Sequence, residues 1–210
     1  FDRPNLSLSI NQKTNWKLQI IDFLNPRKEQ SGIIYCLSRK KTEEVSSFLI
    51  EKGFNASAYH AGLEPLVRKN VQNIFMTAQF HIVVATIAFG MGIDKPDIRF
   101  VLHLNLPGSM ESYYQEIGRA GRDGKPADTL LIYGLDDLVI RRRMIEESVS
   151  ENEYKLNENK RLDYLLSYSE TPECRRKVLL AYFDDIPKKC NNCDNCLNPP
   201  KLIDGTVLAQ

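Results

Sequence analysis

The sequence lacks the features that would mark a membrane, secreted or strongly basic protein. It has no run of about eighteen apolar residues, so no segment is expected to span a membrane. Its 28 basic and 27 acidic residues leave a formal net charge of +1. Any nucleic-acid site must therefore be a local arrangement of charge. No secretory signal is present and the chain begins at Phe1, so we expect a piece of a longer protein.

Cysteine is scarce, and its distribution argues against the disulfide framework of a secreted domain. Of the five cysteines, four are crowded near the end of the chain, at Cys174, Cys190, Cys193 and Cys196. Four thiolates can close a tetrahedral metal site that has no open position, which indicates a structural zinc ion. A disulfide or redox role is the alternative. Cys36, at the end of a predicted strand, is expected to be a small core residue.

The remaining pattern is that of a globular α/β protein, with 42% apolar and 26% charged residues. Short apolar runs alternate with segments of helical period, which predicts right-handed βαβ units and a parallel sheet flanked by helices. The predicted strands are residues 33–36, 56–59, 82–85, 100–104 and 129–133. A small helical appendage should follow, with helices at 138–145, 155–168 and 175–183.

Polar residues follow several of these predicted strands. In parallel sheets, ligands bind beyond the carboxyl ends of the strands. We therefore expect Ser38, His60, Thr86 and the loop of residues 90–94 to share one edge of the sheet.

Residues 115–124 contain two arginines three positions apart, Arg119 and Arg122, and each follows a glycine. At a helix end, this spacing lets both guanidinium groups reach one side. Guanidinium groups stay charged and can bind two phosphate oxygens at once, so the stretch predicts a phosphate contact. A surface loop rich in glycine and arginine is the alternative.

Three stretches together carry a family resemblance: residues 59–63, 85–94 and 114–124. With these stretches in this order, and the cysteine cluster after them, the chain resembles the RecQ family of DNA helicases, bacterial members included. The resemblance covers essentially the whole chain. It implies a linker at 1–12, a C-terminal RecA-like motor domain at 13–135, a helical zinc-binding subdomain at 136–198, and a linker at 199–210 toward a missing winged-helix domain.

The resemblance implies ATP-driven 3′ to 5′ unwinding of DNA in repair, recombination, replication and the SOS response, in the cytoplasm at the nucleoid. The implied partners are single-stranded DNA, duplex junctions, the N-terminal RecA-like lobe and, as a candidate, single-strand-binding protein. That other lobe would supply the P-loop and the magnesium ligands. This chain has no Gly-x-x-x-x-Gly-Lys-Ser/Thr motif, so alone it is not expected to hydrolyse ATP.

By similarity, Arg122 is the predicted arginine finger and Arg119 its phosphate-contacting neighbour. A structural ion pair is the alternative for Arg119. Gln115 would couple the site to the first lobe. Asp94 would lie near the ribose or the opposing lobe, or would cap the segment that follows it. Gly90 and Gly92 would let backbone N–H groups approach a phosphate, or would simply form a turn.

The same resemblance predicts contacts with the DNA strand. The positions that match are Ser38, Arg39, His60, Gly62, Thr86 and Gly90. Contacts with phosphates position a strand without reading its sequence, as a translocating motor requires. A structural role is the alternative for His60. Residues 141–143 are three arginines that we expect to form a solvated helix face rather than a DNA contact.

The cysteine spacing, with fifteen residues after Cys174 and two residues in each later gap, matches the RecQ zinc subdomain. Two other functions stay open. An RNA-directed superfamily 2 motor shares similar glycine and arginine motifs, but its finger stretch typically begins His-Arg, and it lacks the zinc cluster. A non-catalytic binding module stapled by zinc would have no P-loop upstream.

Overall fold

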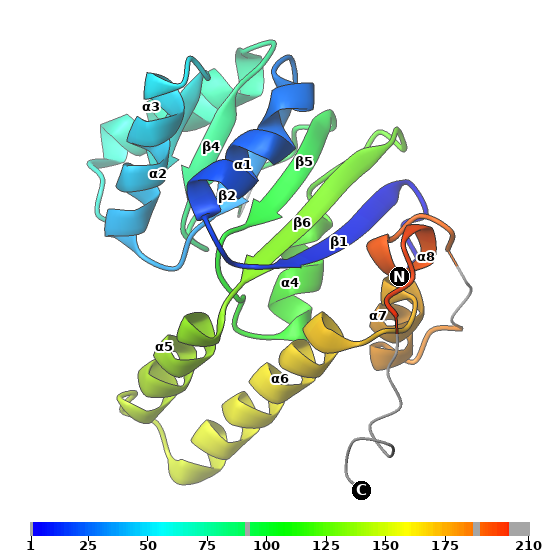
Figure 1. Cartoon of the computed structure of the whole chain (residues 1–210). Helices are drawn as coiled ribbons and strands as arrows, with labels where there is room; N and C mark the ends of the chain where they lie inside the picture. Colours follow the sequence, from blue (N-terminus) through cyan, green and yellow to red (C-terminus); the bar gives the residue numbers. More distant parts are fainter. Residues whose placement is uncertain (1, 91–92, 187–189, 202–210) are drawn as a thin grey trace, which may run out of the picture.

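A computed structural model describes residues 2–90, 93–186 and 190–201, and its centre is one six-stranded sheet (Figure 1). Every neighbouring pair of strands is parallel, and the order is β1-β6-β5-β2-β4-β3. The strands are β1 Leu6–Gln12, β2 Ser31–Tyr35, β3 Ala56–Tyr59, β4 Ile82–Ala85, β5 Ile98–His103 and β6 Ala127–Tyr133. The predicted parallel α/β architecture is confirmed.

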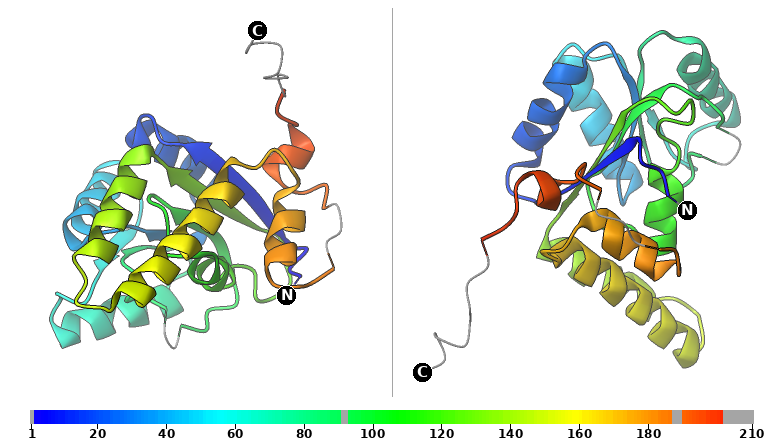
Figure 2. Two further views of the ribbon diagram at one scale, coloured as in Figure 1. Left: turned by 90° about the horizontal axis from the view of Figure 1, so that it is seen from below. Right: turned by 90° about the vertical axis from the view of Figure 1, so that its right-hand side faces the viewer.

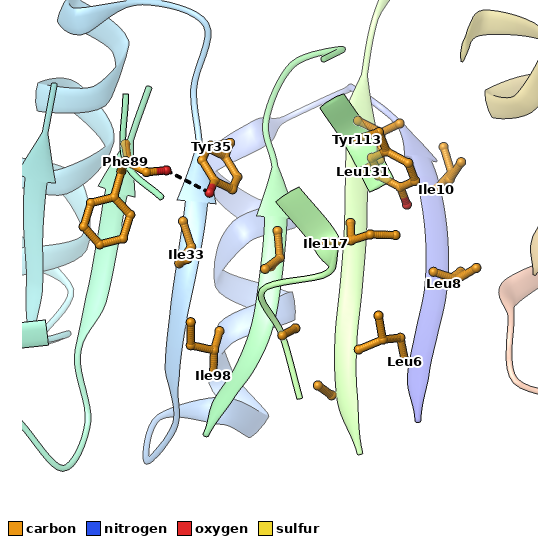
Figure 3. Close-up of a cluster of buried hydrophobic side chains, with 14 of the residues drawn as sticks. Leu6, Leu8, Ile10, Ile33, Tyr35, Phe89, Ile98, Tyr113, Ile117 and Leu131 are labelled. Atoms are coloured by element: carbon orange, nitrogen blue, oxygen red, sulfur yellow. Dashed lines mark hydrogen bonds between the residues drawn. The ribbon is translucent and has the colours of Figure 1, made fainter. Parts of the chain in front are cut away.

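Helices cover both faces of the sheet, as the edge-on view in Figure 2 shows. Successive strand residues point to opposite faces, so Ile33 and Ile34 lie in two different buried clusters. One cluster packs against α1 and α2, and the other (Figure 3) packs against α3 and α4. These helices are α1 Trp16–Leu24, followed by the 3-10 turn η1 Asn25–Arg27, α2 Arg39–Glu51, α3 Pro65–Thr77 and α4 Met110–Ile117. Because β2 and β4 are buried at every residue, their sequences are continuously apolar or small.

The first strand differs from expectation. We expected residues 1–12 to be a linker, but Leu6–Gln12 form β1, which pairs in parallel with β6 along its whole length. Leu6, Leu8 and Ile10 are buried in the cluster under α4, and the residues between them are not, which is the alternation of a strand covered mainly on one face. The segment is therefore part of the six-stranded sheet itself.

The C-terminal helices share this core. They are α5 Leu135–Glu146, α6 Asn152–Glu170, α7 Arg175–Tyr182 and α8 Asp194–Leu197. Leu165, Tyr168 and Leu179 are buried in the same cluster as Ile117 of α4, so the helical part continues the core of the lobe. Among the described residues, no helix combines the length and apolar character needed to cross a bilayer.

One arginine of α5 departs from the expected solvated face. Arg142 and Arg143 are exposed, but Arg141 is half-buried, and its Nε donates to the carbonyl oxygen of Leu106 at 2.9 Å. Burial lowers the pKa of Arg141 from its ordinary value. Arg141 therefore ties α5 to the chain that follows β5.

Candidate nucleotide, nucleic-acid and metal sites

Arg119 and Arg122 lie in the turn that follows helix α4. Its start is capped by Ser109, whose Oγ accepts a hydrogen bond from the backbone N of Ser112 at 3.2 Å. After Gly118 the chain turns through Gly121, whose φ of +56° suits glycine and is rare for other residues. The capped helix and the tight turn thus fix the backbone positions of Arg119 and Arg122.

Arg122 lies at the surface, with 37% of its side chain exposed. Its Nη1 donates to Asp94 Oδ1 at 2.8 Å and to the carbonyl oxygen of Ile93 at 3.2 Å. The Asp94 side chain is 85% exposed, so this ion pair contributes only about 0–1 kcal/mol. Arg122 is held in place, yet a phosphate could replace Asp94 as its anionic partner.

Arg119 is more enclosed than Arg122. Its Nη1 donates to the carbonyl oxygen of Gly90 at 2.6 Å, and a Cβ on Gly90 would overlap the guanidinium group. The hydroxyl of Tyr35 lies beside Arg119 and donates to the carbonyl oxygen of Phe89 at 3.1 Å (Figure 3). Burial raises the pKa of Tyr35 above its ordinary value, so the hydroxyl keeps its proton. Arg119 thus ties the turn after α4 to Gly90 through a main-chain carbonyl oxygen rather than through a carboxylate.

The expectation that Asp94 shares an edge with Ser38, His60 and Thr86 is wrong. The segment after Thr86 joins two parallel strands, so it must return from the carboxyl end of β4 to the amino end of β5. At that end, the backbone N of Gly121 donates to the carbonyl oxygen of Ile98, the first residue of β5, at 2.8 Å. Arg122 and Asp94 therefore lie near the amino ends of the strands. Gln115 is exposed on α4, and Gly92 lies outside the described residues.

The carboxyl edge does gather the other predicted residues. Ser38, His60 and Thr86 follow β2, β3 and β4, which are neighbours in the order β2-β4-β3. Ser38 is exposed and caps α2, because its Oγ accepts from the backbone N of Lys41 at 3.2 Å. Thr86 is half-buried, and its backbone N donates to the carbonyl oxygen of Tyr59 at 3.2 Å.

His60, Arg39 and Gly62 form one packed corner of this edge. His60 is buried, with its Nε2 3.0 Å from Glu43 Oε1, an arrangement that favours the structural interpretation. Arg39 and Gly62 are exposed. A Cβ added to Gly62 would lie 3.0 Å from Arg39 Nη1, so the glycine leaves room for this arginine to lie across the loop.

The four C-terminal cysteines converge on one point. Their Sγ atoms all lie within 4.8 Å of one another. Measured separations are 3.4 Å for Cys174 to Cys190, 3.9 Å for Cys190 to Cys196, and 4.0 Å for Cys193 to Cys174. Four sulfurs at a Zn–S distance of about 2.3 Å would lie about 3.8 Å apart in a tetrahedron. The cluster therefore fits a four-coordinate zinc ion.

The surroundings act differently on the individual cysteine thiols. The backbone N of Asn192 donates to Cys190 Sγ at 3.4 Å. Burial opposes ionisation of Cys174, but backbone hydrogen bonds from Lys177 and Cys190, together with the thiols of Cys190 and Cys196, lower its pKa to about 7. Burial raises the pKa of Cys193 to about 12, so that sulfur would need the metal to stay deprotonated.

Two buried polar clusters had no signal in the sequence. His103 Nε2 lies 2.6 Å from Glu116 Oε2 under the sheet. Asp137 is fully buried and accepts hydrogen bonds at 2.6 Å from both Lys13 and Asn105. The partners of Asp137 come from separate parts of the chain, so no local spacing marks them.

Two protein families match this chain. Residues 14–124 match the family described as helicase conserved C-terminal domain, and residues 135–197 match the family described as RecQ zinc-binding. ATP-dependent DNA helicase RecQ of Haemophilus influenzae is 46% identical over 100% of this chain and 34% of its own length. A putative ATP-dependent RNA helicase of Acanthamoeba polyphaga mimivirus is 42% identical over 97% of this chain and 37% of its own length. The chain thus spans about a third of the length of these relatives.

The fold also resembles a solved structure. Domain 2 of the DEAD-box helicase Mss116p, solved bound to an RNA duplex, superposes with a TM-score of 0.58 at 17% identity. The match covers 86% of this chain and 87% of that chain, and at this identity it concerns the fold alone. The chain belongs to the RecQ family of helicases, of which it comprises the C-terminal helicase domain and the zinc-binding region.

Proposed function

We propose that this chain is the second motor lobe of an ATP-dependent 3′ to 5′ DNA helicase and that Arg122 is its arginine finger. The observation that carries the proposal is the exposed Arg122 guanidinium, held at a turn by Asp94 and by the Ile93 carbonyl. Negative charge shifts onto phosphate oxygens during phosphoryl transfer, and an arginine from a second domain typically contributes about 10³–10⁵ in rate. Asp94 keeps that guanidinium oriented until the nucleotide takes its place.

The division of labour between lobes follows from what this chain contains. ATP and magnesium would be held largely by the N-terminal lobe, since this sequence has no P-loop. Arg119 contributes by supporting the Gly90 turn beside Arg122, and it is the proposed phosphate-contacting neighbour of the finger. Gln115, exposed on α4, would face the other lobe.

The carboxyl edge is the proposed track for the DNA strand. Ser38, Arg39 and Gly62 are exposed there, and Thr86 is half-buried between them in the strand order. His60 would support Glu43 and Gly62 from inside rather than contact the strand. Family membership supports duplex junctions and single-strand-binding protein as partners, DNA repair and recombination as the setting, and a place at the nucleoid.

The proposal is tested by ATP hydrolysis in the full-length parent, with Arg122→Ala and Arg122→Lys. We expect Arg122→Ala to lower kcat by about 10³-fold or more while ATP binding stays nearly intact. Lysine should restore little, because one ammonium cannot reproduce the planar fork. The matched control is Arg142→Ala, which also breaks an exposed arginine–aspartate pair, to Asp163 at 2.9 Å, and should leave kcat unchanged. Unchanged turnover in Arg122→Ala would remove Arg122 from the finger role.

The added nucleic acid separates the candidate functions. Stimulation of hydrolysis by single-stranded DNA supports the DNA motor. Stimulation by RNA alone would favour an RNA-directed motor, a candidate that the name of the mimivirus relative brings forward. No hydrolysis with either would favour a zinc-stapled binding module.

A further inference from the structure

The first residues of the chain lie against the turn that carries the arginines. We call residues 2–5 the N-terminal strap and residues 118–125 the arginine loop. Arg3 of the strap donates to three carbonyl oxygens of this loop. Its Nη1 reaches Gly118 at 3.3 Å, and its Nη2 reaches Ala120 at 2.9 Å and Gly121 at 2.8 Å. One guanidinium group therefore holds the backbone on both sides of Arg119.

Asn5 adds two contacts to the same loop. Its Nδ2 donates to the carbonyl oxygens of Gly121 and Lys125, each at 2.9 Å. A Cβ added to Gly121 would lie 2.5 Å from this Nδ2, so only glycine allows the approach. Asn5 thus spans the base of the turn from which Arg122 projects.

These contacts matter because carbonyl groups beyond the end of a helix have no partner within the helix. Such loops are usually the mobile parts of a protein. Here five hydrogen bonds from Arg3 and Asn5 occupy the carbonyl oxygens of Gly118, Ala120, Gly121 and Lys125. The peptide groups that lead into Arg122 are therefore fixed before any ligand arrives.

The strap is held in turn by the zinc-binding part of the chain. Arg176 of α7 is buried, and its Nη1 donates to Asp2 Oδ1 at 2.8 Å and to the Arg3 carbonyl oxygen. Its Nη2 donates to the carbonyl oxygen of Leu6. Since Cys174 begins the same helix, the metal site, α7, the strap and the arginine loop form one continuous set of contacts.

We infer that Arg3 and Asn5 are positioning residues for the arginine finger, and that Arg176 holds them in place from the zinc-binding subdomain. The inference rests on the proposed role of Arg122. Neither Arg3 nor Asn5 needs to touch the nucleotide. They act by presenting Arg122 at a fixed distance and angle, and a misplacement of about 1 Å can cost about 10²-fold in rate.

The test uses DNA-stimulated ATP hydrolysis by the full-length parent. Arg3→Ala should lower kcat by about 10–10²-fold. Its KM for ATP should stay within about threefold, because the loss of an interaction made in the transition state lowers kcat rather than ground-state binding. Arg3→Lys should not restore kcat, since an ammonium group cannot reach the three carbonyl oxygens in one plane. Asn5→Ala should lower kcat by a smaller factor, again with little change in KM. If Arg3→Ala does not fold, the kcat of Asn5→Ala tests the inference.

Arg27→Ala is the matched control. Arg27 also uses three donors, to Asp128 and to the Phe23 carbonyl, but on the opposite face of the sheet. It should lower thermal stability without lowering kcat at a temperature where the chain is folded. Bound zinc, about one per chain, should be unchanged in all these variants. A fall in kcat that tracks lost zinc or lost stability would overturn the inference.

A double-variant cycle separates positioning from a general structural effect. If Arg3 acts through Arg122, Arg3→Ala should cost almost nothing further in a chain that already carries Arg122→Ala. Arg176→Ala should show the same non-additivity. Additive losses, or an unchanged kcat in both Arg3→Ala and Asn5→Ala, would overturn this inference but leave the proposed role of Arg122 standing. An unchanged kcat in Arg122→Ala would instead overturn the proposed function.

Discussion

At the scale of single residues, the arginines differ in what their guanidinium groups hold. The four arginines involved in the proposals above each donate to a main-chain carbonyl oxygen far away in sequence: Arg3, Arg119, Arg122 and Arg176. Three of the four are half-buried or buried, and only Arg122 among them is exposed. Burial commits an arginine to the fold, because a buried charge needs partners that the fold supplies. Exposure is what leaves Arg122 available for an incoming phosphate.

The Arg122–Asp94 pair should contribute little to stability. We expect Asp94→Asn in this chain to change the free energy of unfolding by less than about 1 kcal/mol, because water screens both partners. Urea denaturation measures this change. The matched variant is Asp137→Asn, which weakens a buried pair with Lys13 at 2.6 Å and should cost about 3 kcal/mol. Equal losses in the two variants would show that Asp94 is structural.

At the scale of elements, local pattern predicted most strands and failed at one edge. The predicted strands at 56–59 and 82–85 match β3 and β4 residue for residue. The strand β4 is buried at every residue, and such parallel strands are short apolar runs. The strand β1 lacks such a run, because in Leu6–Ile10 only every second residue is apolar. Its pairing with β6 is needed to recognise it, and that partner lies more than a hundred residues away.

The turn after α4 allows a direct test of crowding. Gly121 and Gly124 both have positive φ, +56° and +77°. A Cβ on Gly121 would lie 2.9 Å from the Lys125 carbonyl oxygen, whereas a Cβ on Gly124 has nothing within 4 Å. Gly124→Ala should therefore cost about 1 kcal/mol for the backbone alone, and Gly121→Ala about 3 kcal/mol.

Thermal and urea unfolding of the two variants give this comparison. Because both glycines have positive φ, the backbone cost of alanine is similar at the two positions. The difference between the two losses of unfolding free energy therefore measures the steric contacts at Gly121. If the two alanines destabilise equally, the close approach of Asn5 to this turn is not a constraint on the fold.

At the scale of the whole molecule, the zinc-binding part and the motor lobe form a single core. Cys193 is buried in the cluster that also holds Leu8 and Tyr113. Cys193 also forms a parallel bridge with Leu8, which protects the outer edge of β1. Arg175 of α7 donates to Asp194 at 3.0 Å, and Asp194 in turn accepts from the backbone N of Ile10 at 2.9 Å. Loss of the metal should therefore be felt in the sheet.

We expect Cys193→Ala to lower bound zinc from about one per chain to near zero and to lower solubility. Hydrogen exchange should then rise in β1 and α7 before it rises in β4, since β1 is the edge that the zinc part covers. Cys36→Ala is the control, because that buried thiol lies in the other core cluster and should leave zinc unchanged. A fully metallated, stable Cys193→Ala chain would refute the four-ligand site.

Local sequence was sufficient for the parallel α/β class, the helical appendage and the cysteine tetrad. Each of these rests on a period or a spacing of neighbouring residues, which short stretches of chain express directly. Three features required the folded chain. These are the different burial of Arg119 and Arg122, the opposite ends of the sheet at which Asp94 and Thr86 lie, and the contacts of the strap. Arg3 and Gly118 are 115 positions apart, and a contact of that kind leaves no local pattern. Burial and long-range hydrogen bonding exist only after folding. They therefore distinguish Arg119, which is enclosed, from Arg122, which is exposed and is the proposed finger.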